Sequence, residues 1–130
     1  MFRRIVTAFV LVAVAACGGE EQKSDRALAV ETIGHADTKA VVAAFFRCLT
    51  DAAPKTPNGK DALDLDRINR VIKACGSEEE AMNAQVSATW GQKSSEREMK
   101  ARFDGLKEEA WKIIRENPYE PPAVNLPAPP

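Results

Sequence analysis

The residues best suited to nucleophilic or metal chemistry are three cysteines and a single histidine in a chain of 130 residues. His35 completes no metal site with the cysteines at any familiar spacing, and every Cys/His or Ser/His arrangement would depend on it alone. The chain also has no glycine-rich phosphate loop, nucleophile elbow or two-histidine metal motif. We therefore predict no enzymatic activity, no cofactor and no metal.

Acidic residues form the other groups that are able to bind a cation. Asp61, Asp64 and Asp66 depart from the EF-hand spacing and have apolar residues between them, so helix capping explains them better than a calcium loop. The acids that follow Ser77 are interpreted in the same way. Ser77 and Glu80 have the spacing of a capping box, which predicts the start of a helix rather than a cation site.

Cys17 ends an N-terminal block with the three parts of an export signal. Arg3 and Arg4 supply positive charge, residues 5–16 form an apolar run, and small residues precede the cysteine. A membrane-spanning helix needs about 20 apolar residues, so this run is too short to be one. The block, with Val-Ala-Ala-Cys at 14–17, resembles the signal of bacterial lipoproteins, although that family more often has leucine in the place of the valine.

The resemblance covers residues 1–17 only and implies a membrane anchor. Residues 1–16 would be removed as a signal peptide, and Cys17 would carry acyl chains on its sulfur and its new amine. Two or more chains hold a protein stably, whereas one chain binds only reversibly. Gly18, which is not the aspartate associated with inner-membrane retention, implies the outer membrane and a periplasmic location. An ordinary secretory signal is the alternative, since residues 13–15 also fit a cleavage site.

The two remaining cysteines, Cys48 and Cys75, are an even pair in a chain that is exported under either interpretation. We predict a disulfide between them, with two buried thiols or an incomplete metal site as the alternatives. In a simple helical hairpin the two cysteines would lie at levels about 15 Å apart, whereas bridged Cα atoms lie at about 5.5 Å. The disulfide therefore requires the connecting loop to run back along the first helix, or the second helix to begin near Asp66.

Hydrophobic periodicity predicts an all-α domain at residues 37–117, built as a small bundle of three to four helices. The helices are expected at about 37–52, from 61 or 64 to 75, at 78–90 and at 96–117. Residues 17–36 are expected to form a flexible tether, although the stretch 27–36 also fits a short helix. The tail 118–130 contains six prolines and is expected to be disordered.

The mature chain should act by binding rather than by catalysis. Without Arg3 and Arg4, 16 basic residues remain against 19 acidic ones, and no basic patch favours nucleic acid. We predict an envelope interaction or accessory module with a protein partner, for which Trp111 and Tyr119 are the candidate contact residues. A small-ligand carrier with an apolar cavity beside Phe45, Phe46 and Trp111 is the first alternative. A hydrolase is the second.

Overall fold

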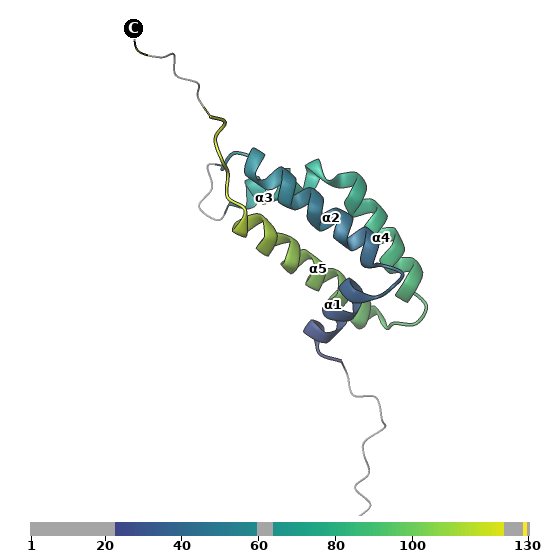
Figure 1. The fold of residues 1–130 in the computed structure, drawn as a ribbon. Coiled ribbons are helices and arrows are strands. Elements are labelled where there is room, and N and C mark those ends of the chain that lie inside the picture. Colours follow the sequence, from purple (N-terminus) through teal and green to yellow (C-terminus); the bar gives the residue numbers. More distant parts are fainter. Residues whose placement is uncertain (1–22, 60–63, 124–128, 130) are drawn as a thin grey trace, which may run out of the picture.

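The computed structural model describes residues 23–59, 64–123 and 129, and these residues contain helices but no strand (Figure 1). The elements are α1 Asp25–Gly34, α2 Lys39–Ala52, the 3-10 helix η1 Ala53–Lys55, α3 Leu65–Ala74, α4 Gly76–Trp90 and α5 Glu96–Glu116. The predicted all-α fold is confirmed, with five α-helices in the described residues instead of three to four.

The membrane anchor is not tested by this part of the chain. The predicted signal peptide 1–16 and the predicted lipidation site Cys17 lie outside the described residues. Across the described ranges, no helix combines the length and the apolar character that a membrane span requires. Lipidation therefore stays a prediction.

The helices α2 and α5 each contact all four other α-helices, and α2 lies in the interior of the bundle. Val42, Phe45 and Leu49 follow at steps of three and four and therefore share one face, which is almost completely buried. A second apolar row, which includes Val41 and Phe46, is partly buried beside it. This wide apolar surface explains why α2 lies in the interior, as its sequence predicts.

The predicted disulfide between Cys48 and Cys75 is confirmed, with 5.9 Å between the two Cα atoms. The second predicted helix begins late, at Leu65, and η1 extends α2 before the chain turns back. From Leu65 to Cys75 the helix rises about 15 Å, which brings the second cysteine level with the first. Closing this loop should stabilise the fold by roughly 3.5 kcal/mol.

The folded unit begins earlier than the predicted boundary at residue 37. Residues 25–34 form α1 and pack against α5, so the assignment of this stretch to the tether is wrong and the alternative of a short helix is confirmed. Leu28 and Thr32 of α1 are fully buried. The approach is close because α5 has Gly105 at the contact, and a Cβ at that position would lie 2.4 Å from the Cβ of Ala29.

The described start of the C-terminal tail has no helix or strand, as its prolines predict. It is nevertheless tied to the bundle, because the backbone N–H of Glu120 donates a hydrogen bond to the carbonyl of Pro54 at 2.8 Å. Tyr119 is half-buried beside this contact. Residues 124–128 and 130 of the tail lie outside the described range.

Candidate functional site

The candidate site is a groove of about 430 Å3 between α3, α4 and α5, with α2 behind it. We call it the apolar groove after its apolar lining residues, which are Phe45, Ile72, Met82, Phe103, Leu106 and Ala110. Two other hollows, of about 400 and 430 Å3, are lined mostly by charged and small side chains. The apolar groove is therefore the better candidate for binding an apolar group.

Helical spacing explains why these side chains converge. On α5, Phe103, Leu106, Lys107 and Ala110 follow at the i, i+3, i+4 and i+7 positions of one face. The α4 lining residues, Glu79, Met82 and Asn83, and the α3 pair, Asn69 and Ile72, obey the same spacing. Three helix faces thus meet over Phe45 of α2.

Four polar residues, Asn69, Glu79, Asn83 and Lys107, line the margin of the groove. Asn69 and Lys107 are exposed, whereas Glu79 and Asn83 are half-buried. No ion pair among the described residues includes Glu79 or Lys107. The margin therefore offers one negative charge, one positive charge and two amides to a ligand.

Trp111 does not line the groove but borders it through Lys107. The Lys107 ammonium lies 5.2 Å from the centre of the indole ring, and the Arg115 guanidinium lies 5.7 Å from it. The indole is half-buried against the core, and its role as a contact residue stays a prediction. Its Nε1 is buried and has no hydrogen-bond partner within the described ranges. Tyr119, the other predicted contact residue, also lies outside the groove lining.

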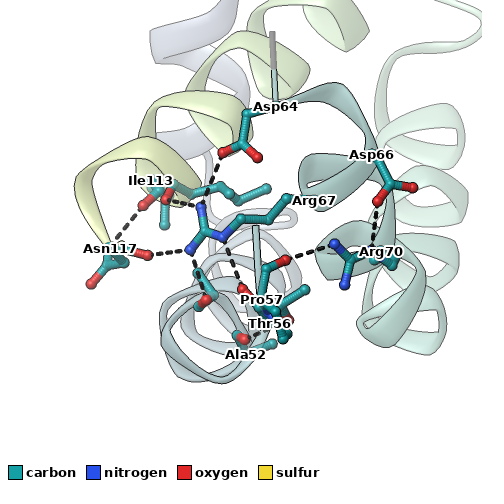
Figure 2. A network of polar contacts seen from close by, with 11 residues as sticks. Ala52, Thr56, Pro57, Asp64, Asp66, Arg67, Arg70, Ile113 and Asn117 are labelled. Carbon is teal, nitrogen blue, oxygen red and sulfur yellow. Dashed lines mark hydrogen bonds and ion pairs between the residues drawn. The ribbon is translucent and has the colours of Figure 1, made fainter. Parts of the chain in front are cut away.

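A buried arginine, Arg67, joins the end of α5 to the segment after α2 (Figure 2). Its guanidinium donates to four backbone carbonyls, those of Ala53, Thr56, Ile114 and Asn117, at 2.7 to 3.2 Å. A carboxylate oxygen of Asp64 lies 3.7 Å from Nη1 of the guanidinium and forms an ion pair with it. The carbonyls and the Asp64 carboxylate occupy the N–H donors of the guanidinium. Arg67 therefore caps helix ends and has a structural role rather than a ligand-binding one.

A second buried arginine, Arg102, holds α1. It donates to the Glu31 carboxylate at 2.9 Å and to the Thr32 hydroxyl at 3.2 Å, and its guanidinium lies 4.3 Å from the centre of the Trp90 ring. Hydrogen bonds from Lys23, and then from Arg102, lower the pKa of Glu31 below its usual value. These contacts link α1 to α4 and α5 and belong to the fold.

Two of the acids considered as cation ligands form ion pairs with arginines. Asp64 pairs with Arg67, and Asp66 pairs with Arg70 at 3.0 Å. Asp61 lies outside the described residues. A search of the described ranges found no group of three or more His, Cys, Asp or Glu residues arranged to hold a metal ion.

The groove could be found only in part from the sequence. Of the three residues predicted to border a cavity, Phe45 lines the groove, whereas Phe46 and Trp111 do not. The polar margin was missed, although Asn83 and Lys107 each directly follow an apolar residue that faces the core. Comparison of the chain with protein-family models, with curated proteins and with solved structures found no match.

Proposed function

We propose that this chain is a lipid-anchored binding module of the bacterial cell envelope and that the apolar groove is its binding site. In this proposal Cys17 anchors the chain in the outer membrane, with the helical bundle in the periplasm. The groove is the observation that carries the proposal. Concave apolar sites of 300 to about 1,000 Å3 with a few polar groups are typical of ligand sites.

The lining of the groove favours binding over catalysis. The described residues that line it supply one carboxylate and one amine, and none of them is a histidine, cysteine, serine or threonine. General acid–base and nucleophilic mechanisms need a reactive group with a partner that activates it. We therefore propose a module without an enzymatic activity of its own.

A protein partner in the envelope is the second candidate, and Trp111 favours it. The indole is half-buried between two cations, and aromatic residues and arginine are frequent in the centres of protein interfaces. The exposed large apolar side chains of the described ranges are Val30 on α1 and Leu65 on α3, and neither lies on α5 with Trp111. The groove therefore has the stronger geometric support.

The anchor and the site can be tested in the same cells. We expect protein from its native membrane to have the mass of residues 17–130 plus acyl chains, and a Cys17→Ser variant to lose both the added mass and the membrane association. A photo-crosslinking residue in place of Phe103, in the groove, should capture a ligand or partner. The same residue in place of the exposed Gln92 is the control.

Two outcomes would contradict the proposal. An unmodified mass would show plain secretion and remove the anchor. Equal capture from positions 103 and 92, or capture that an Asn69→Trp obstruction at the margin leaves unchanged, would remove the groove as the binding site. Asn69 is exposed, so this substitution should leave the fold intact.

A further inference from the structure

We infer that the apolar groove binds a fatty acid, with the acyl chain in the groove and the carboxylate at Lys107. The inference rests on the proposed function, because it names the ligand class for the proposed site. Three features support it, namely the size of the groove, the charges at its margin and the distance to the proposed anchor.

The size and lining of the groove suit one flexible acyl chain. Its volume of about 430 Å3 is bounded by buried apolar side chains of three helices, including Phe45, Met82 and Leu106. The unbranched thioether of Met82 adapts to a chain of variable shape better than a branched aliphatic side chain does. A partner helix would need a much longer surface than these residues supply.

The positive charge for the carboxylate comes from Lys107. This exposed lysine lines the groove, and no carboxylate of the described residues pairs with it. Arg115 lies on the same side of α5 and reinforces the charge, since both cations lie over the Trp111 ring. An acyl carboxylate at this point would gain a charge-assisted hydrogen bond.

The remaining polar residues favour a head with a single negative charge. Asn69 and Asn83 carry amide groups that can donate to a carboxylate oxygen. Glu79 lines the same margin and repels a head with two negative charges about twice as strongly as a head with one. A carboxylate therefore fits better than a phosphate that carries two charges.

The proposed anchor places the groove near a source of acyl chains. Residues 18–24 separate Cys17 from the first residue of α1, Asp25. The eight steps from Cys17 to Asp25 span at most about 29 Å, at about 3.6 Å per residue. A chain anchored at Cys17 would thus keep its bundle close to the bilayer surface, where free fatty acids partition.

The test uses the chain from Gly18 onward, which lacks the lipidated cysteine but contains all described residues. Binding is measured by calorimetry and by the fluorescence of the tryptophans, since Lys107 contacts Trp111. The probes are dodecanoate below its micelle concentration, dodecanol, dodecyltrimethylammonium and acetate. We expect dodecanoate to bind about tenfold or more tightly than the neutral and cationic probes, and acetate not to bind.

Variants distinguish the contribution of the carboxylate head to binding from that of the acyl chain. Lys107→Gln should weaken dodecanoate binding by about tenfold and leave dodecanol unchanged. Lys112→Gln, an exposed lysine of the same helix outside the groove, should change neither. Asn69→Trp should weaken the binding of both dodecanoate and dodecanol. Far-UV circular dichroism would show that this variant keeps its helices.

Three results would overturn the inference. These are no saturable binding of dodecanoate, tightest binding of the cationic probe, or equal weakening of dodecanoate by Lys107→Gln and Lys112→Gln. The proposed function would survive any of them if position 103 still captured a different ligand in native membranes. It would fall with the inference only if that capture were also absent.

Discussion

Replacing Gly105 by alanine should loosen α1 from α5, because the two helices meet at this glycine. A Cβ at position 105 would lie 2.4 Å from the Cβ of Ala29 and 3.4 Å from its Cα. Carbon atoms in ordinary contact lie about 3.5–4.0 Å apart, so α1 must shift by more than 1 Å. That shift would disturb Leu28 and Thr32, which are fully buried on the same helix.

The expected magnitude is the balance of two effects. Glycine inside a helix costs up to about 1 kcal/mol relative to alanine, so the substitution gains that amount from propensity. Overpacking a close contact costs about 1–3 kcal/mol, which leaves a net loss of roughly 1 kcal/mol. Gly76→Ala is the matched control, because no atom lies within 4 Å of a Cβ at Gly76, and it should stabilise slightly.

Urea unfolding followed by far-UV circular dichroism gives the unfolding free energies of the Gly105→Ala and Gly76→Ala variants. Hydrogen exchange reports on the protection of the α1 amides. Pairing Gly105→Ala with Ala29→Gly should recover most of the loss from overpacking, because the opposing Cβ is removed. If Gly105→Ala were as stable as Gly76→Ala, with unchanged protection of α1, the packing of α1 on α5 would be refuted.

Three further predictions concern polar contacts. Arg67→Ala should lower the unfolding free energy by about 3–5 kcal/mol, because four backbone carbonyls lose their hydrogen bonds to the guanidinium. Arg70→Ala, at a more exposed ion pair, should lower it by about 1 kcal/mol or less. Similar losses for the two variants in urea titrations would contradict this. Ser95→Ala removes a capping box and should cost about 1 kcal/mol, while Ser77→Ala should change little, and a thermal melt showing the reverse order would disprove the assignment. The pKa of Glu31 is lowered in the folded state from 4.5, so its contribution to stability is present above that value and is lost as the pH falls through the folded pKa. Glu31→Gln should therefore flatten the pH dependence of stability below about pH 4.5. An unchanged pH profile would count against the pairing of Glu31 with Lys23 and Arg102.

The parts of the fold that the sequence predicts are those where one strong local signal decides the outcome. The apolar rows of α2 required an interior position, and the even cysteine pair required the disulfide. Ser95 and Glu98, which have the spacing of a capping box in the sequence, form one at the start of α5. Each of these features depends on residues that are close in sequence or chemically unique in the chain.

The parts that were missed depend on contacts between distant residues. Within α1 only Leu28 and Thr32 are buried, so its apolar periodicity is weak. The residue that allows its close approach, Gly105, lies far along the chain. The capping box predicted at Ser77 is wrong, because α4 begins at Gly76 directly after Cys75, which leaves Ser77 inside the first turn. The buried positions of Arg67 and Arg102 follow from carbonyls and a carboxylate that the fold brings to them.

The same tertiary contacts explain why the apolar groove stays open. The helices α4 and α5 both pack on α2 and contact each other little, so their facing sides leave a space above Phe45. One end of α3 is joined to α2 by Cys75, and the other end is joined to α5 by Arg67. These two ties fix the helix that carries Asn69 and Ile72 at the edge of the space. A rigid arrangement of the lining helices lowers the entropy cost of ordering the site on binding. Loss of the disulfide or of the Arg67 hydrogen bonds should therefore weaken the binding of a ligand in the groove and also lower the stability of the fold.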